Sequence, residues 1–599
     1  MADRDGAGDV GSANVAFARA LVDQLCAGGL AAAFVCPGSR STPLALAIAE
    51  SRGLPHWVHV DERSAAFHAL GYARATDRPV ALVCTSGTAG ANFLPAVAEA
   101  FHSRAPLVVL TADRPPELRA WGAAQTMEQR TLFAAFTRWS EEAPCPSERG
   151  GEPAYARALA RRALHEATGP APGPVHLNLP FREPLLPASI AVAEISRPPP
   201  EPRAVASRDP RAATGAAGAV AAETLNAVAE LADVERGVLV LGPDRWDPEL
   251  AGAVHALAAA LGWPVIADPA SGLRAGPMTS SSVIHGADLL LRDASTAARL
   301  RPDLVVRCGA LPTSKALGEW IARHEAADVC LVDPAGGFRD PQHRASRSLR
   351  LGSRQFCELA CAMRGTTRPV PGSWLAQWRR ADEVARAAAA NAIAAESRLF
   401  TPHVARALWE TLPSGAALYV ANSMPIRELD AFADPREGDL RVLANRGVNG
   451  IDGLVSAACG ASAALGGPAV LWCGDLALLH DVSGLLAGRM HGADLTIVVS
   501  NDDGGGIFEY LPAARTLPRP MFERMFAVPH GLDLCAIARG LGWEASRVAT
   551  AAELAASVSR SIAGGRHLIE VSVDRAANTA CHHAIHAAVG AALRRESAA

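Results

Sequence analysis

The sequence predicts an α/β protein of three consecutive domains, each a mostly parallel sheet flanked by helices. Three observations support this prediction. The chain has 599 residues, too many for a single hydrophobic core. Compact apolar runs closed by Gly, Pro or Asp alternate with Ala-rich helical stretches, and two Pro-rich segments interrupt the alternation. Short apolar runs with helices between them are typical of parallel strands that are covered on both faces.

The first domain is expected at residues 1–190. Its strands are predicted at four compact apolar runs and at a shorter run just before Glu62: 31–38, 79–87, 105–113, 173–180 and 56–61. The segment 191–215 is rich in proline and therefore predicts a linker without regular structure.

The central domain is expected at residues 216–365 and the third domain at 401–599, with a linker and a long Ala-rich helix at 366–400 between them. In the central domain the predicted strands are 236–243, 263–268, 302–309 and 328–334. In the third domain they are 417–423, 468–475, 495–503 and 567–574. The similar size of the three parts favours three α/β units joined by Pro-rich linkers.

The composition argues against several classes of partner. Hydrophobic residues make up 49% of the chain, charged residues 20%, and the net charge is −4. This balance gives no electrostatic reason to bind nucleic acid or a membrane surface. The first residues lack the pattern of a signal peptide, and no apolar stretch reaches the roughly 18 residues of a membrane span. We therefore expect a cytoplasmic protein whose 12 scattered cysteines are reduced thiols.

One cluster near the end of the chain allows two interpretations. Cys581, His582, His583 and His586 include two histidines four residues apart, which could share a helix face and bind a metal. The alternative is a solvated or interface face of a helix. We favour it because no complementary pair of ligands stands out elsewhere.

The most informative motif lies in the third domain. Gly474-Asp475 ends one apolar run, and Asn501-Asp502-Asp503 ends the next, 27 residues later, before Gly504, Gly505 and Gly506. This spacing leaves room for a helix and a return strand, so both acids should lie at the carboxyl edge of the sheet. Two carboxylates there suit Mg²⁺, and glycine N–H groups suit phosphates. A helix cap followed by a Gly-rich turn is the simpler alternative for either half taken alone.

The whole pattern resembles the diphosphate-binding motif of thiamine diphosphate enzymes, with Asp502 where that family usually has Asn. Further blocks occur in order along the chain: PGSRSTPL, DERSAAFHALG, TSGTAGAN, LTADRPPELR, ANSMPIRELD, NRGVNGIDG and GGGIFEYLP. Together they resemble the 2-succinyl-5-enolpyruvyl-6-hydroxy-3-cyclohexene-1-carboxylate synthase family of the menaquinone pathway. The resemblance implies a transferase, or carboligase, that requires thiamine diphosphate and Mg²⁺ or Mn²⁺. Such an enzyme decarboxylates 2-oxoglutarate and adds the succinyl carbanion to isochorismate.

The resemblance also assigns roles to individual residues. Glu62, Gln125 and Arg446 are expected at the reacting centre, and Asp475, Asp502 and Gly504 at the metal. Both substrates are dicarboxylates, which suit the planar fork of arginine; the expected substrate contacts are Ser39, Arg40, Arg114, Lys315, Ser423, Arg427 and Arg446. The expected cofactor contacts are Glu62, Thr85, Ser86, Gly87, Met424, Ile451, Gly474, Asp475, Leu476, Gly504, Ile507 and Phe508, with Leu511 walling the same cavity.

In this family Glu62 and the diphosphate motif meet across subunits, which implies a homodimer or homotetramer with the cofactor at the interface. Three alternatives stay open at this stage. Another thiamine enzyme of the acetolactate synthase type would not need several carboxylate-binding arginines. A non-catalytic thiamine diphosphate sensor should have lost Glu62. A generic NAD-binding protein should have better spaced glycines.

Overall fold

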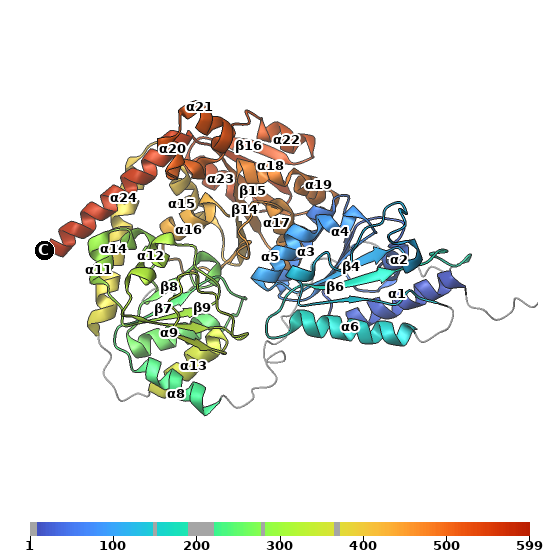
Figure 1. The fold of residues 1–599 in the computed structure, drawn as a ribbon. Coiled ribbons are helices and arrows are strands. Elements are labelled where there is room, and N and C mark those ends of the chain that lie inside the picture. Colours follow the sequence, from blue (N-terminus) through green and yellow to red (C-terminus); the bar gives the residue numbers. More distant parts are fainter. Residues whose placement is uncertain (1–8, 148–151, 190–220, 277–281, 365–371, 599) are drawn as a thin grey trace, which may run out of the picture. The chain divides into compact units, whose positions relative to one another are not determined.

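A computed structural model describes residues 9–147, 152–189, 221–276, 282–364 and 372–598 (Figure 1). It contains three parallel sheets of six, five and six strands, so the predicted fold class is confirmed. The linker expected at 191–215 lies outside the described residues. The chain forms two compact units: residues 1–205, 445–466 and 478–494 make the first unit, and the other residues make the second.

The sheet of the first unit has the order β2-β1-β3-β4-β6-β5. Its strands are β1 (Ala33–Val35), β2 (His56–Val58), β3 (Val80–Cys84), β4 (Leu107–Asp113), β5 (Trp139–Glu142) and β6 (Val175–Pro180). The accompanying helices are α1 (Val10–Ala27), α2 (Thr42–Glu50), α3 (Glu62–Thr76), α4 (Thr88–Asn92), α5 (Leu94–Ser103) and α6 (Glu152–Thr168). β3 and β4 are buried along their whole length, as their continuous apolar runs predict.

Two helices from later in the chain complete the first unit, α17 (Leu454–Leu465) and α19 (Val482–Met490). α17 packs closely on α3 because glycines stand at the contact. A Cβ atom on Gly71 would lie 1.8 Å from the main-chain oxygen of Ala457, and one on Gly460 would lie 2.0 Å from that of His68. The two backbones therefore fix the position of the helix that begins with Glu62.

The smaller sheet of the second unit has the order β8-β7-β9-β10-β11, which is the doubly wound order 2-1-3-4-5. Its strands are β7 (Gly237–Leu241), β8 (Val265–Ala267), β9 (Leu304–Cys308), β10 (Asp328–Val332) and β11 (Arg347–Leu349). Alternate residues of β7 face two cores: Val238 and Val240 pack with residues of α10 (Ala287–Leu291) and α12 (Lys315–Arg323). Leu239 and Leu241 pack with residues of α8 (Ala222–Ala232), α9 (Leu250–Leu261) and α13 (Ser353–Arg364).

The larger sheet of the second unit has the order β13-β12-β14-β15-β17-β16. Its strands are β12 (Ala416–Val420), β13 (Leu440–Leu443), β14 (Ala469–Gly474), β15 (Leu495–Asn501), β16 (Glu544–Val548) and β17 (Arg566–Ser572). The other helices are α11 (Ala294–Arg299), α14 (Gly372–Ala395), α15 (Thr401–Thr411), α16 (Met424–Phe432), α18 (Asp475–His480), α20 (Ala513–Thr516), α21 (Arg519–Phe522), α22 (Leu534–Gly540), α23 (Ala551–Ser561) and α24 (Arg575–Ala598). The Ala-rich run predicted to be helical is α14.

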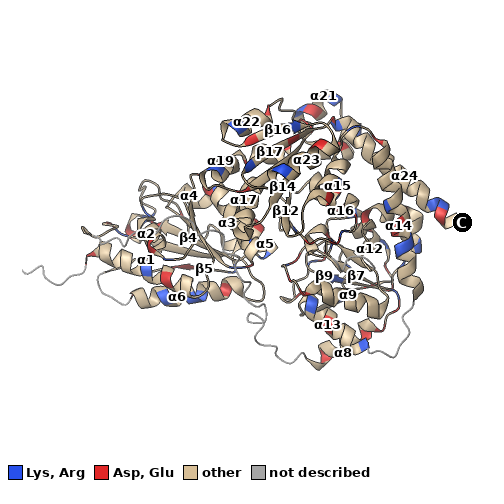
Figure 2. Cartoon of the chain, turned by 180° about the vertical axis from the view of Figure 1, so that it is seen from behind, with Lys and Arg blue, Asp and Glu red and all other residues tan. Residues whose placement is uncertain are grey.

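Acidic and basic residues are interspersed on the helices of both units, as Figure 2 shows. Within the described ranges, none of the helices is both long enough and apolar enough to cross a membrane.

Candidate active site

The predicted acidic pair lies at the carboxyl edge of the larger sheet. β14 and β15 are neighbours, with Gly474 opposite Ser500, so their ends bring Asp475 and Asp502 to adjacent positions. Asp475 begins α18, and its two carboxylate oxygens accept hydrogen bonds from Leu476 N (2.6 Å) and Gly504 N (2.8 Å). Both acids therefore lie at the ends of neighbouring strands, as their spacing in the sequence predicted.

The side chain of Asp502 is half-buried, and its carboxylate is only partly satisfied by hydrogen bonds. Burial, and then the charge of Asp475, raise its pKa to about 8. Among the described residues, its Oδ1 atom is buried and accepts no hydrogen bond. A Cβ atom on Gly506 would lie 1.7 Å from Asp502 Oδ2, so a side chain at position 506 would displace this carboxylate. Two close carboxylates, one with an unsatisfied buried oxygen, form a donor set that fits a hard divalent ion such as Mg²⁺.

His530, which was not predicted from the sequence, lies beside Asp475. Its Nε2 atom is 3.2 Å from Asp475 Oδ2, and its Nδ1 atom accepts a hydrogen bond from Leu532 N at 3.0 Å. Because Nδ1 accepts this hydrogen bond, the ring proton lies on Nε2, which donates a hydrogen bond to Asp475 Oδ2. Asp503 holds the same loop by accepting from His530 N and Gly531 N. No sequence spacing signals this contact, because His530 lies on a loop after two short helices.

In the first unit, Glu62 is the first residue of α3, as predicted. Asp61 caps the helix by accepting from Arg63 N at 2.8 Å and Ser64 N at 3.4 Å. The cap fixes the first turn, and the Glu62 side chain is half-buried there.

The loop after β3 and the predicted Gln125 lie in contact. Ser86 Oγ donates to Gln125 O at 2.9 Å, and Gln125 Nε2 donates to Ser86 O at 3.1 Å. Gly87 has a φ of 87°, which suits glycine, and its N–H donates to Gln129. The structure therefore brings Gln125, expected at the reacting centre, next to Ser86 and Gly87, expected at the cofactor, and Gln129 supports this loop. Thr85 is buried beside them.

Arg40 and Arg114 converge on one carboxylate. Arg40 is 3% exposed and donates to Phe181 O at 2.9 Å and to Glu183 Oε1 at 2.7 Å. Arg114 Nη1 lies 3.9 Å from the same oxygen of Glu183. The neighbouring Ser39 is exposed. Two of the three guanidinium nitrogens of Arg40 thus have protein partners, which the sequence did not predict.

Three further predicted residues stand where β12 meets α16. Ser423 has a φ of 71°, and Met424 begins the helix. Arg427 donates back to the main-chain oxygen of Ser423, one turn earlier.

Ile507 and Phe508 lie on a short 3₁₀ helix, Gly506–Tyr510, where Phe508 packs edge-on against Phe526 with ring centres 5.8 Å apart. Leu511 follows and is 45% exposed.

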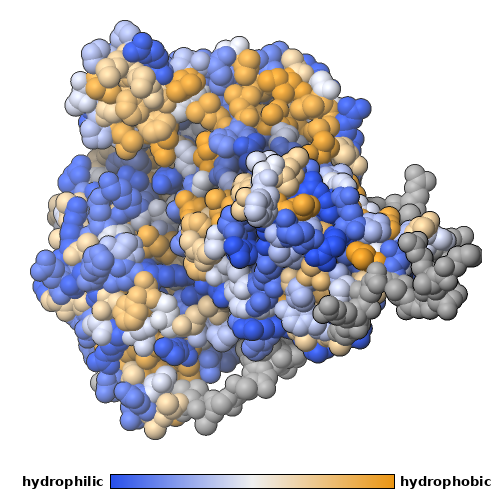
Figure 3. Space-filling model, turned by 45° about the vertical axis from the view of Figure 1, so that its right-hand side comes forward, coloured by the Kyte–Doolittle hydropathy of each residue, from blue (hydrophilic) through white to orange (hydrophobic). Residues whose placement is uncertain are grey.

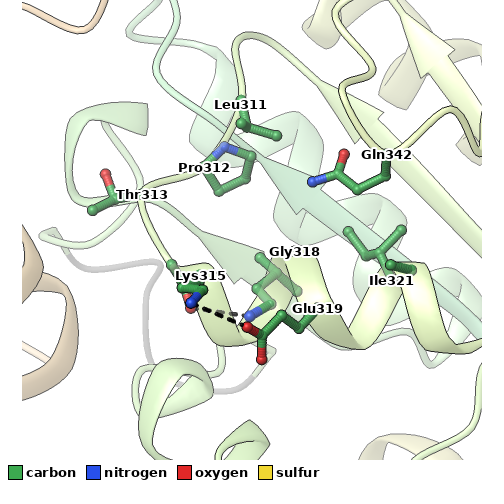
Figure 4. A pocket seen from close by; sticks show the side chains of 11 residues that line it. Leu311, Pro312, Thr313, Lys315, Gly318, Glu319, Ile321 and Gln342 are labelled. Atoms are coloured by element: carbon green, nitrogen blue, oxygen red, sulfur yellow. Dashed lines mark hydrogen bonds and ion pairs between the residues drawn. The ribbon is translucent and has the colours of Figure 1, made fainter. Parts of the chain in front are cut away.

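Lys315 lies at the rim of a cavity of about 340 Å³ at the start of α12. Figure 4 shows Leu311, Ile321 and Gln342 around this cavity and Lys315 paired with Glu319. The Lys315–Glu319 distance is 3.5 Å, and the lysine side chain is 87% exposed. An exposed, weakly paired ammonium group is available to an anionic ligand.

The histidines of α24 differ in exposure, and His582 is the one that is packed into the protein. His582 is 3% exposed and lies 3.1 Å from Glu428 and 3.2 Å from Thr401, while His583 is exposed. The described residues contain a different group of convergent metal-ligand types, Asp533, Cys535 and Glu570. Arg547 already pairs with both carboxylates of that group, at 2.7 and 3.0 Å. The guanidinium group of Arg547 therefore already supplies the positive charge that a metal ion would bring to these carboxylates.

Comparisons with known proteins agree with this geometry. Three family models match: the N-terminal TPP binding domain of thiamine pyrophosphate enzymes at residues 15–132, the middle domain of thiamine pyrophosphate at 220–420, and the C-terminal TPP binding domain at 435–571. Asp475 and Asp502 lie in the third match, and Glu62 lies in the first. The cofactor expected from the sequence, thiamine diphosphate, is therefore confirmed.

Similar proteins extend over nearly the whole chain. A 2-succinyl-5-enolpyruvyl-6-hydroxy-3-cyclohexene-1-carboxylate synthase of Geobacillus kaustophilus is 45% identical over 94% of this chain and 96% of its own length. Synthases with the same name are 42% identical in Chloroflexus aurantiacus (96% of each chain) and 44% identical in Myxococcus xanthus (97% of this chain and 98% of the relative). This identity over nearly full length places the chain in the thiamine-diphosphate-dependent 2-succinyl-5-enolpyruvyl-6-hydroxy-3-cyclohexene-1-carboxylate synthase family.

Proposed function

We propose that this chain decarboxylates 2-oxoglutarate and transfers the succinyl group to isochorismate, giving 2-succinyl-5-enolpyruvyl-6-hydroxy-3-cyclohexene-1-carboxylate and CO₂. The observation that carries the proposal is the pair of close carboxylates, Asp475 and Asp502, at the edge of a sheet whose sequence matches the cofactor-binding domain. Thiamine diphosphate, when bound, would supply the nucleophilic carbon and the electron-accepting ring that decarboxylation of a 2-oxo acid requires.

The residues of the second unit would hold the diphosphate and its metal. Asp475, Asp502 and the main chain of Gly504 would bind Mg²⁺, with Mn²⁺ as an alternative of similar ligand preference. His530 would keep Asp475 in its ligating orientation through the Nε2–H donor. Ile507 and Phe508, on the helix that follows the glycines, would pack against the cofactor.

The residues of the first unit would act on protons and on substrate carboxylates. Glu62 would hold the proton at the aminopyrimidine ring of the cofactor. Gln125, fixed by Ser86, would lie at the reacting centre. Arg40 and Arg114 both lie beside Glu183. A substrate carboxylate would bind near the same two guanidinium groups, whose planar forks suit it.

We also propose a homodimer, or a homotetramer built from dimers, with the cofactor between subunits. Val482, Leu486 and Met490 follow one another at four-residue intervals on α19 and are 37%, 37% and 50% exposed. The second unit exposes Met521, Met525 and Val528. Figure 3 shows hydrophobic side chains gathered at several places on the surface that it presents. Exposed apolar stripes of this kind favour a protein partner.

The reaction is tested with purified protein, thiamine diphosphate and Mg²⁺. Isochorismate consumption is followed with 2-oxoglutarate, with pyruvate in its place, and with neither acid. Loss of isochorismate only with 2-oxoglutarate is expected. Turnover with pyruvate alone would instead favour chemistry of the acetolactate synthase type. Cofactor binding without turnover in any mixture would favour a sensor.

A further inference from the structure

A single buried side chain holds the segment that carries Arg446. Residues 445–450 lie in the connection between β13 and α17 and contain Arg446. Glu99, on α5, accepts a hydrogen bond from Gly447 N at 2.6 Å through Oε1 and from Val448 N at 2.7 Å through Oε2. Both oxygens of one carboxylate therefore bind consecutive N–H groups just after Arg446. Glu99 and this segment both belong to the first unit, and Glu99 is 2% exposed.

The main chain of the segment lies directly on α5. A Cβ atom on Gly447 would be 2.4 Å from Glu99 O and 2.8 Å from Ser103 N. Both of these atoms belong to the helix backbone and cannot move aside easily. Only glycine permits this close approach. Gly447 therefore lets the segment lie on α5, where the carboxylate of Glu99 binds it.

The charge of Glu99 is costly to bury, and the surroundings compensate for it only in part. Burial raises its pKa, while the two N–H donors and the guanidinium groups of Arg74 and Arg446 favour the charged form. A carboxylate that accepts two main-chain donors makes strong, directional hydrogen bonds. Such a group fixes the path of a loop more firmly than an apolar contact would.

We propose that Glu99 is a positioning residue, which sets the direction from which Arg446 meets the substrate by clamping Gly447 and Val448. This inference rests on the proposed function, because Arg446 is assigned to substrate there. Glu99 itself lies under the segment, and its carboxylate oxygens point to main-chain donors. It acts through Arg446, and its loss should weaken substrate binding more than it weakens the fold.

The test is Glu99→Gln, which keeps the shape and one acceptor oxygen but presents an NH₂ group to the second N–H. We expect kcat/KM for at least one of the two acids to fall about tenfold, mainly through KM. Hydrogen exchange of the Gly447 and Val448 amides should accelerate about tenfold in the same variant. Asp382→Asn is the matched control, because Asp382 is also a buried carboxylate that accepts a glycine N–H at 2.6 Å, from Gly286.

A KM within twofold of wild type for both acids, or unchanged exchange of these two amides, would overturn the proposal. So would an equal rise in KM in Asp382→Asn, because the effect would then be general. If wild-type protein does not consume isochorismate with 2-oxoglutarate, the proposed function fails. Hydrogen exchange alone then shows whether Glu99 holds the Gly447 and Val448 amides. If Glu99→Gln does not fold, Gly447→Ala keeps the carboxylate, displaces the segment and should raise KM in the same way.

Discussion

Three histidines are packed together in the first unit, and they predict a loss of stability in acid. His59 follows β2, His68 lies on α3 and His491 follows α19. The ring centres are 4.5 Å apart for His59 and His491 and 5.0 Å apart for His59 and His68. Within the described part of the chain, neither ring nitrogen of His68 has a hydrogen-bond partner. Phe34, Trp57 and Tyr72 surround the cluster with neutral rings.

Burial, reinforced by mutual repulsion, keeps these imidazoles neutral. The pKa of His59 falls to about 3, that of His491 to about 4, and that of His68 well below its ordinary value of 6.5. Since the unfolded chain takes up protons below pH 6.5 and the folded chain does not, stability is full above pH 6.5. It falls as the pH drops from about 6.5 toward about 3. At pH 5.5 each histidine lowers the free energy of unfolding by about 1.4 kcal/mol relative to neutral pH, and the three together lower it by about 4 kcal/mol.

The perturbation is His68→Phe, which keeps an aromatic ring beside Phe34 and removes one titrating group. Relative to wild type, the melting temperature of the variant should rise by about 1 °C more at pH 5.5 than at pH 7.5, because the unfolding entropy of a 599-residue chain is large. Thermal unfolding followed by circular dichroism at both pH values measures this difference. His165→Gln, at an exposed position on α6, is the control and should show almost no such difference. An equal effect of His68→Phe at both pH values would refute the reasoning.

Three further predictions concern the cofactor site. Glu62→Gln should bind thiamine diphosphate with near-normal affinity yet lose most turnover, because the proton at the aminopyrimidine ring is no longer held. Calorimetry measures the affinity, and single-turnover kinetics measure the chemical step. Normal turnover would remove Glu62 from the mechanism. Asp475→Ala should weaken Mg²⁺-dependent cofactor binding by about tenfold or more, and unchanged affinity by calorimetry would exclude it as a ligand. Mixing Glu62→Gln and Asp475→Ala subunits should restore about a quarter of wild-type activity if each site combines two chains, and none if each site lies within one chain.

The strands that the sequence failed to predict share one physical property. β5, β11, β13 and β16 were all missed, and all four lie at the edges of their sheets. An edge strand is covered less completely than a central one, so its sequence need not be a continuous apolar run. In β16 (Glu544–Val548) only the last residue is buried, whereas β3 and β4 are buried throughout. The apolar signal is therefore absent at these four margins, whereas β8, an edge strand that is buried along its whole length, was predicted from its apolar run.

The candidate site divides along a similar line. Asp475 and Asp502 could be placed together because the carboxyl ends of neighbouring parallel strands meet at one edge, whatever the loops do. His530 and Glu99 could not be found in this way. Each reaches its partner through tertiary packing, His530 from a loop and Glu99 from α5, a helix 348 residues away along the chain. The end of a strand can be predicted from the local sequence, but a partner that reaches it from a distant part of the chain cannot.

The partners of Arg40 bear on its proposed contact with the substrate. Residue type and loop position predicted an arginine that offers its fork to a dicarboxylate, and the structure shows the same fork already bonded to Phe181 O and Glu183. A guanidinium group held by two protein acceptors loses little further freedom when a ligand arrives, so it can orient a substrate carboxylate at low entropic cost. Arg114, 20% exposed and only 3.9 Å from Glu183, is the more accessible of the two. The first contact with an incoming carboxylate should therefore fall to Arg114, with Arg40 as the fixed wall behind it.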